Sequence, residues 1–365
     1  MILPIIGLLL SITQAGLPTA LFTLTSSDKK VNYLISCLKL TINQFILCLI
    51  FILIFKKSIS IINPYQSTIL IFTFIASLSA LFRSIHLGKQ NAPITAIAQI
   101  IEETVRITSI YIDYQLTKTN TLNNLFHAML LGEFSSCLYM YSKLDKVSLK
   151  HKSDFYYKDI LSISLPVSLS QIIHSLTHFL EPILFQYFLL KQNYSLIQIQ
   201  ESYGIITGQV LSLLMIPTFL NSTIYKLLLP KIKDSKNKVK LFNKATLLCL
   251  LIGLPFSIIF FFFPDLCLEF LYKNNTGSIY LRYISIPFLI FYMQTPISAF
   301  LQAYKKQAIL LRNSIIESIV SLSLLIILIP SYHETSLLIS YLSGLVIYTT
   351  LSFISIIKLL FLNKE

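Results

Sequence analysis

The chain is poor in charged residues, since Asp, Glu, Lys and Arg make up only 12% of its 365 residues. Soluble domains contain about 25% charged residues. The low charge, together with 55% hydrophobic residues and a mean hydropathy of +0.72, excludes an ordinary soluble protein. We therefore expect an all-α, polytopic membrane protein.

Motifs of several chemical classes are also missing from the sequence. The five cysteines lack C-x-x-C spacing and lie mostly in apolar runs, which excludes a recognisable metal centre or disulfide framework. There is no P-loop, Gly-rich phosphate cradle or nucleophile elbow, which excludes ATP hydrolysis and covalent catalysis. We expect no enzyme activity, cofactor or bound metal. Met1 runs straight into apolar sequence without a basic segment, so we expect no removable signal peptide.

Apolar runs long enough to cross a bilayer, about 20 residues each, predict about eleven helices. They lie near 2–24, 31–55, 66–87, 92–115, 122–142, 160–189, 203–229, 241–263, 280–303, 309–329 and 335–360. The longest polar joint predicts a division into an N-terminal lobe of five spans (1–142), a cytoplasmic linker (143–159) and a C-terminal lobe of six spans (160–365).

The net charge of +13 lies mostly in alternate short joints between the apolar runs. That distribution orients helices in a membrane and attracts anionic headgroups, so we expect no nucleic-acid partner. By the positive-inside rule the basic joints and the C-terminus are cytoplasmic. The basic joints are 25–32, 83–90, 143–158, 226–240 and 305–312.

Two internal echoes predict a repeat. The segment 17–21 (LPTAL) resembles 216–220 (IPTFL), and Lys89-Gln90 with the following QIIE resembles Lys306-Gln307 with the following SIIE. Their similar offsets favour two pseudo-repeated lobes of the same orientation, related by an axis along the membrane normal. Because the first lobe has one span fewer, we expect it to lack its opening helix.

Two of the predicted helices carry polar stripes. In the span 165–185 the stripe contains Gln171, His174, His178 and Glu181, which share one narrow face at 100° per residue. Ionisable groups facing lipid cost ~2.5–3.5 kcal/mol each, so this face meets protein or a wet cavity. Interhelical hydrogen bonding and recognition of a sugar or phosphate remain alternatives. The two histidines have no third ligand at a recognisable spacing, which disfavours zinc.

The second stripe follows Pro93. Glu102 and Arg106 are i,i+4 with the acid first, the favourable order for an intrahelical ion pair. Either the pair is structural, or Arg106 leaves its carboxylate to bind a pyrophosphate with paired guanidinium donors. The stripe comprises Thr95, Gln99, Glu102, Arg106, Ser109 and Asp113.

Several segments resemble the stage V sporulation protein B branch of the polysaccharide transporters, in the superfamily that also holds the lipid II flippase and the multidrug and toxin extruders. The segments are 15–20, 82–106, 165–182 and 300–307, in the expected order over nearly the whole chain. The resemblance implies two six-helix lobes, a V-shaped central cavity, alternating access and a lipid-linked sugar as cargo. Relatives begin with a further helix carrying a cavity arginine, and many have two further helices at the end.

The leading hypothesis is a flippase-like transporter that moves a lipid-linked sugar or peptidoglycan precursor across the bacterial plasma membrane, for the spore cortex or the cell envelope. We expect a monomer among membrane lipids, with a proton or sodium ion as a candidate coupling ion. Alternatives are a cation-coupled small-molecule exporter of the same superfamily, or a reduced, non-transporting remnant. The residues expected to bind substrate are Gln99, Glu102, Arg106, Gln171, His174, His178 and Glu181.

Overall fold

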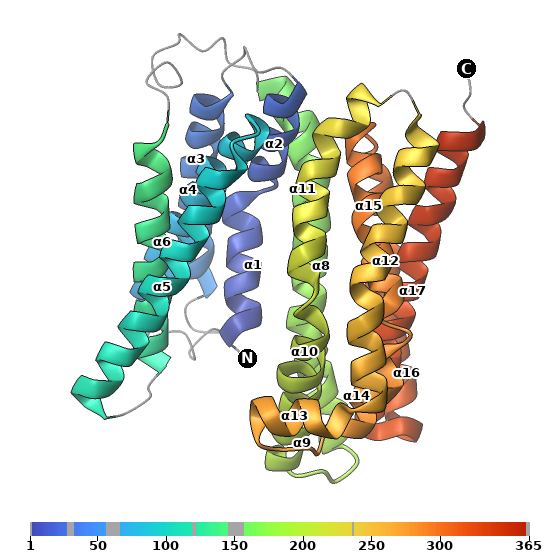
Figure 1. Ribbon diagram of the computed structural model, residues 1–365. Helices are drawn as coiled ribbons and strands as arrows, with labels where there is room; N and C mark the ends of the chain where they lie inside the picture. Colours follow the sequence, from blue (N-terminus) through green and yellow to red (C-terminus); the bar gives the residue numbers. More distant parts are fainter. Residues whose placement is uncertain are drawn as a thin grey trace. The chain divides into compact units, whose positions relative to one another are not determined.

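Figure 1 shows the computed structural model, which describes residues 2–27, 33–55, 66–118, 122–144, 157–235 and 237–362. Within these ranges every regular element is a helix, so the all-α class predicted from the sequence is confirmed. Contacts divide the chain into two units, 1–175 and 176–365, with the boundary inside helix α8 (Tyr157–Leu190). The predicted linker 143–159 lies mostly outside the described residues, so its role as a boundary stays a prediction.

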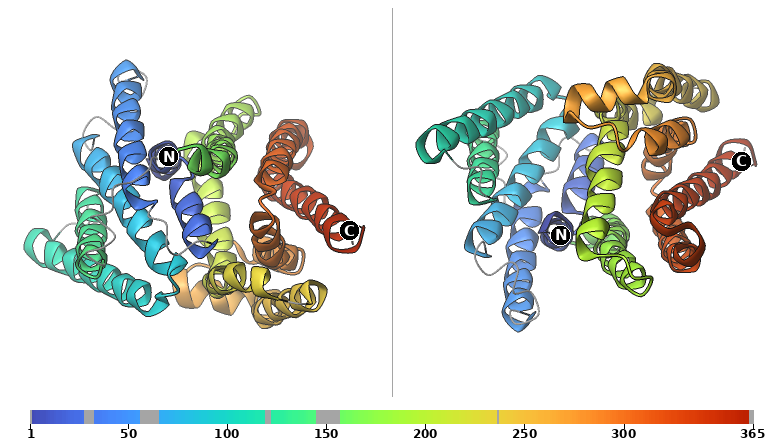
Figure 2. Two further views of the ribbon diagram at one scale, coloured as in Figure 1. Left: turned by 90° about the horizontal axis from the view of Figure 1, so that it is seen from above. Right: turned by 90° about the horizontal axis from the view of Figure 1, so that it is seen from below.

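Unit 1 is a helical bundle with an apolar interior. Its core gathers Leu21, Leu81, Ile85, Met140 and Ile160 from four helices, each with 2% or less of its surface exposed. In Figure 2, α5 and α6 run side by side in both views, and they make the most extensive helix contact of the unit. The helices are α1 (Ile2–Gln14), α2 (Leu17–Ser27), α3 (Leu34–Phe55), α4 (Gln66–Gly88), α5 (Ala92–Thr117), α6 (Leu122–Ser142) and the first part of α8.

The first predicted span, 2–24, is a bent pair of helices. α1 and α2 meet at 45°, and Ala15 and Gly16 at the break have φ angles of 42° and 65°. A Cβ atom on Gly16 would lie 2.5 Å from the carbonyl oxygen of Ser164 in α8. Both the left-handed backbone and this close approach therefore require glycine at position 16.

Unit 2 packs its remaining helices around a second core, in which Phe185, Phe288 and Tyr292 are among the largest buried side chains. Gly253 lets α12 approach the Tyr292 ring, because a Cβ atom there would lie 2.4 Å from a ring carbon. The elements are the rest of α8, α9 (Leu196–Tyr203), η2 (Gly204–Leu211), α10 (Ser212–Met215), α11 (Thr218–Asp234), α12 (Lys238–Phe262), α13 (Pro264–Tyr272), α14 (Ser278–Ser285), α15 (Leu289–Ala303), α16 (Gln307–Tyr332), η3 (His333–Thr335), α17 (Ser336–Ile357) and η4 (Lys358–Leu362).

The two sequence echoes lie at bends and turns of the two units, although the turns match Gln90 with Lys305 rather than with Gln307, as the echo aligned it. The segments 17–21 and 216–220 lie at the breaks of two bent pairs, α1 with α2 at 45° and the stretch 196–215 with α11 at 50°. The turns between α4 and α5 and between α15 and α16 are also alike, since Gln90 and Lys305 have φ angles of 64° and 56°. In each turn the amide of the next residue, Asn91 or Lys306, donates to the carbonyl oxygen five residues earlier at 2.8 Å. The two turns thus share one local geometry. The two bent pairs share a similar angle only, because Ala15 and Gly16 have positive φ angles whereas Ile216 and Pro217 are right-handed helical.

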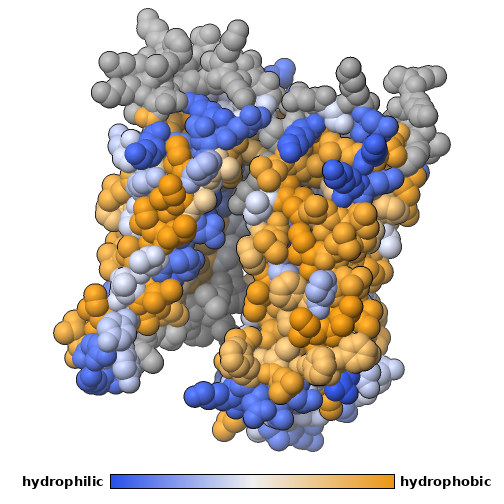
Figure 3. Space-filling view, in the orientation of Figure 1, coloured by the Kyte–Doolittle hydropathy of each residue, from blue (hydrophilic) through white to orange (hydrophobic). Residues whose placement is uncertain are grey.

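Four stretches of the described residues are long and apolar enough to cross a membrane, or up to seven if each bent pair is one span. The four are Ser67–Gly88, Tyr157–Leu190, Lys238–Phe262 and Gln307–Leu360. The last stretch holds both α16 and α17. Helix α5 carries four charged residues and is too highly charged to count among these apolar stretches. Figure 3 shows an apolar band between polar ends on unit 2. The polytopic organisation is therefore clear, and the number eleven stays a prediction.

Candidate functional site

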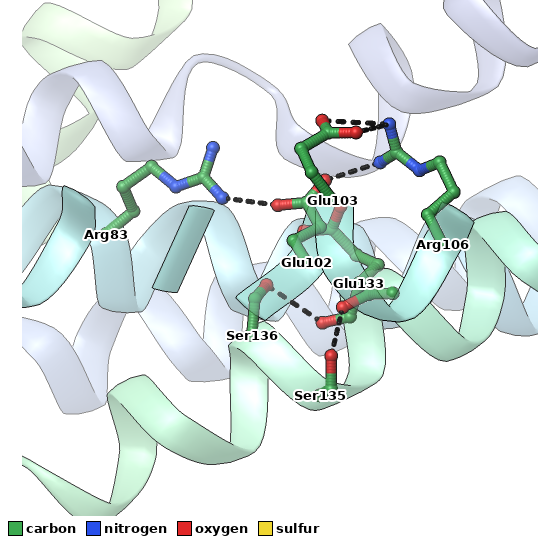
Figure 4. Close-up of polar contacts among 8 residues, drawn as sticks. Arg83, Glu102, Glu103, Arg106, Glu133, Ser135 and Ser136 are labelled. Atoms are coloured by element: carbon green, nitrogen blue, oxygen red, sulfur yellow. Dashed lines mark hydrogen bonds and ion pairs between the residues drawn. The ribbon is translucent and has the colours of Figure 1, made fainter. Parts of the chain in front are cut away.

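The most highly charged cluster of the described residues lies in unit 1, where α4, α5 and α6 meet. Glu102 on α5 is at its centre, with 9% of its side chain exposed. Its Oε1 accepts a hydrogen bond from Nη2 of Arg106 at 2.6 Å, and its Oε2 accepts one from Nη2 of Arg83 on α4 at 3.0 Å. One buried carboxylate thus holds two guanidinium groups from two helices (Figure 4).

The two arginines are bound unequally. Nη1 of Arg106 also donates to both carboxylate oxygens of Glu103, at 3.0 and 3.1 Å, and the Glu103 side chain is 48% exposed. Arg83 makes a single ion pair among the described residues, with Glu102. The Nε atoms of both arginines are buried and have no hydrogen-bond partner in the described part of the chain. Guanidinium donors therefore remain unused on both residues.

Helix α6 approaches the cluster through Gly132 and Glu133. A Cβ atom on Gly132 would lie 2.8 Å from the carbonyl oxygen of Glu102 and 3.4 Å from Cβ of Arg106, so glycine allows the two helices to touch at the ion pairs. Glu133 interacts electrostatically with Glu102 and with Arg83. Two guanidinium groups thus face three carboxylates, and the cluster is short of one positive charge when all five groups are ionised.

An excess negative charge inside a membrane protein is costly, so it favours uptake of a proton or another cation. Alternatively, an anion can replace Glu102 as the partner of the arginines, because phosphate oxygens accept paired guanidinium donors in the same geometry. The arrangement is therefore suited to exchanging one ionic partner for another.

A second cluster of ionisable side chains lies in unit 2. Nδ1 of His178 is 3.4 Å from Oε2 of Glu181, and Glu181 is buried with 8% of its surface exposed. Glu317 on α16 interacts electrostatically with His178, and its Cγ would lie 3.4 Å from a Cβ atom on Gly344 of α17. Tyr341 on α17 interacts electrostatically with both glutamates. Three helices, α8, α16 and α17, therefore assemble this group.

The structure brings some predicted site residues together and separates others. Glu102 and Arg106 form the ion pair that their i,i+4 spacing predicts, and Nδ1 of His178 lies 3.4 Å from Oε2 of Glu181 on the predicted common face of α8. The predicted α5 stripe is only partly buried, because Glu102 is buried whereas Gln99 is exposed.

The predicted α8 stripe is divided between the two units. Gln171 and His174 belong to unit 1, and His178 and Glu181 to unit 2. Oε1 of Gln171 is buried and has no hydrogen-bond partner among the described residues, while His174 is exposed.

Sequence reasoning missed Arg83 as a partner of Glu102 and Glu317 as a neighbour of His178. Both contacts cross between helices, so no spacing along the chain predicts them. The described residues contain no group of three or more His, Cys, Asp or Glu side chains placed to hold a metal ion.

Two family models match parts of the chain. The model of a family described as polysaccharide biosynthesis protein matches residues 1–236, and that of the MatE family matches residues 233–327. Stage V sporulation protein B of Bacillus subtilis (strain 168) is 28% identical over an alignment of 311 positions, which covers 78% of this chain and 60% of the relative. The chain thus spans less than two thirds of the length of that relative.

Solved structures share the fold. An outward-facing multidrug resistance MATE family transporter matches with a TM-score of 0.73 at 15% identity, over 99% of this chain and 86% of the other. A Vibrio cholerae MATE transporter matches with a TM-score of 0.78 at 13% identity, again over 99% and 86%. An inward-facing MATE transporter matches with a TM-score of 0.66 at 15% identity, over 99% and 90%. These identities are low, so the likeness establishes the fold alone.

Proposed function

The chain belongs to the polysaccharide biosynthesis protein family of multi-pass membrane transporters, and we propose that it moves a lipid-linked sugar across the plasma membrane by alternating access. Transporters of this superfamily are not enzymes, and the cargo crosses without covalent change. The sporulation role in the relative's name supports a peptidoglycan precursor for the spore cortex or cell envelope as the cargo. In this proposal the chain works as a monomer. Its C-terminus lies in the cytoplasm, an orientation supported by the positive charge of the basic joints.

The observation that carries the proposal is the sharing of buried Glu102 by Arg83 and Arg106. A lipid-linked sugar carries a diphosphate between its sugar and its polyprenyl chain, and its two phosphate groups can each accept paired donors from one of two adjacent guanidinium groups. In the proposed cycle the diphosphate replaces Glu102, which then accepts a proton or pairs with one arginine only. Hydrogen bonds to charged groups contribute ~1.5–3 kcal/mol each, enough to offset the loss of one carboxylate partner.

The sugar would meet neutral or titratable polar groups. Gln99, Gln171, His174 and His178 remain our candidates for this part of the site, because amide and imidazole groups both donate and accept hydrogen bonds. The buried, unpartnered Oε1 of Gln171 supports a ligand or water at that position. The polyprenyl chain would stay in the bilayer throughout.

A second candidate is export of a small molecule coupled to a cation. It is favoured by the group formed by His178, Glu181 and Glu317, which can take up a proton or a sodium ion between α8 and α16. Glu102 and Glu103 offer a further ion site in unit 1. Under this alternative Glu181→Gln would abolish drug resistance in a sensitive host.

The test is leaflet transfer of a fluorescent polyprenyl-diphosphate-linked disaccharide in vesicles that contain the full-length protein. We expect transfer by the wild type and a loss of about 10-fold or more in Arg83→Ala and in Arg106→Ala, from the value of a charged hydrogen bond. Arg282→Ala is the matched control, because its guanidinium is 49% exposed and 3.9 Å from Asp265. If a known flippase works in the same vesicles and the wild-type chain does not, the chain is a non-transporting remnant and the proposal is wrong.

A further inference from the structure

A pocket of about 440 Å³ lies in unit 2 where α16 begins and α17 ends. Lys306, the residue before α16, contributes to its lining, as do Arg312 in the second turn of α16 and Lys358 at the start of η4. Most of the remaining lining is apolar, including Leu351 and Ile354 of α17. The pocket therefore joins a cluster of three cations to an apolar wall.

Among the described residues, no carboxylate balances the positive charge of this pocket. No acidic residue is among its lining residues, and none of the three cations forms an ion pair in the part of the chain that the structure describes. The nearest polar partner of Arg312 is neutral, since its Nε and Nη2 donate to Oδ1 of Asn313 at 3.3 and 3.2 Å. Three like charges around one cavity repel each other, so the site gains from an anion.

The apolar wall indicates what kind of anion fits. Ile354 in this wall is 50% exposed, so part of the apolar lining is open to the surroundings of the bundle. The three cations lie at one end of the antiparallel pair α16 and α17, which is where the headgroup layer meets a membrane-spanning helix. A free phosphate would leave the apolar wall unused, whereas a lipid would cover it with an acyl chain.

We propose that this pocket is a binding site for an anionic phospholipid, with its phosphate between Lys306, Arg312 and Lys358 and an acyl chain along Leu351 and Ile354. The site is independent of the proposed cargo site, because it lies wholly in unit 2 and shares no residue with the clusters around Glu102 or Glu181. The proposal is that one lipid headgroup binds at this defined site, in addition to the general attraction of basic loops to an anionic membrane surface.

The test is native mass spectrometry of the full-length protein in detergent, titrated with phosphatidylglycerol or with phosphatidylcholine of the same acyl chains. We expect one phosphatidylglycerol to bind in preference to phosphatidylcholine. A juxtamembrane cation is worth ~1 kcal/mol, or about fivefold in affinity, so the triple variant K306A/R312A/K358A should lose on the order of 100-fold.

The matched control is K231A/K240A/K244A, which removes three exposed lysines of α11 and α12 outside the pocket and should lose less than about threefold. The charge-preserving variant K306R/R312K/K358R should bind phosphatidylglycerol with an affinity within about threefold of the wild type. That result would show that the triple alanine variant loses affinity through its lost charges and not through a change of fold. Equal losses in the first two variants, equal binding of the two lipids, or displacement by inorganic phosphate as efficient as by phosphatidylglycerol would each overturn the proposal.

Discussion

Replacing Glu102 is predicted to be the most destabilising single change among the carboxylates of the unit 1 cluster. Glu102→Ala removes the acceptor of both Arg83 and Arg106 from a site where the carboxylate is 9% exposed. Breaking a fully buried ion pair costs ~3–5 kcal/mol. The arginine side chains are 31% and 27% exposed, so water replaces part of the lost interaction, and we expect a loss of roughly 2–3 kcal/mol in the free energy of unfolding.

Glu103→Ala is the internal control for this prediction. Glu103 carries the same charge, is adjacent in sequence and pairs with the same Arg106, but its side chain is 48% exposed. Exposed pairs contribute ~0–1 kcal/mol. Unfolding of the purified proteins in mixed micelles, followed by circular dichroism over a denaturant titration, gives both values.

The bridging role of Glu102 also predicts a result for a double variant. Once Glu102 is alanine, Arg83→Ala should cost less than it does in the wild type, because the two residues are partners. Losses for Glu102→Ala and Glu103→Ala that agree within about 0.5 kcal/mol, or strictly additive losses for Arg83 and Glu102, would refute the view that one buried carboxylate holds the cluster together.

Three further changes test other parts of the molecule. Gly132→Ala should destabilise the protein by ~1–3 kcal/mol, because the new Cβ atom would lie 2.8 Å from a backbone oxygen of α5. Gly7→Ala, where a Cβ atom would have no neighbour within 4 Å, should be neutral or stabilising. Equal thermal shifts of the two variants would contradict the close packing at Gly132. Asn313→Ala should cost ~1–3 kcal/mol in chemical unfolding, since its amide donates to Ser352 in a buried bond of 2.9 Å, and an unchanged midpoint would exclude that bond. An impermeant maleimide should label Cys267 from outside the cell, as the proposed orientation requires, and labelling only after lysis would reverse that orientation. Because burial raises the pKa of this thiol, its labelling rate should keep rising with pH above the range in which a free cysteine is fully ionised.

The parts of the structure that follow from local sequence were predictable. The ion pair between Glu102 and Arg106 follows from i,i+4 spacing with the acid first, and the contact of His178 with Glu181 follows from their common helix face. The echo around Pro18 and Pro217 lies at a bend in each unit, but the bends differ: the first has left-handed residues at Ala15 and Gly16, and at the second Ile216 and Pro217 are right-handed helical.

The contacts between helices were not predictable from spacing. Arg83 reaches Glu102 only because the turn at Gln90 sets the register of α4 against α5, and a change of one residue in that turn would rotate Arg83 away. Gly132 gives no signal of its role in the sequence, because a helical glycine is equally compatible with open space, as at Gly7. The bent first span was also missed, since hydropathy measures apolar length and is blind to a left-handed residue such as Gly16.

The central claim, that Arg83 and Arg106 exchange Glu102 for the diphosphate of a lipid-linked sugar, is tested most directly by equilibrium binding. The affinity of a fluorescent polyprenyl-diphosphate-linked disaccharide would be measured for the wild type, for Arg83→Ala/Arg106→Ala and for the exposed control Arg282→Ala. We predict a loss of at least about 100-fold in the double variant and none in the control, from ~1.5–3 kcal/mol per charged hydrogen bond. Equal affinity in all three proteins would contradict the claim.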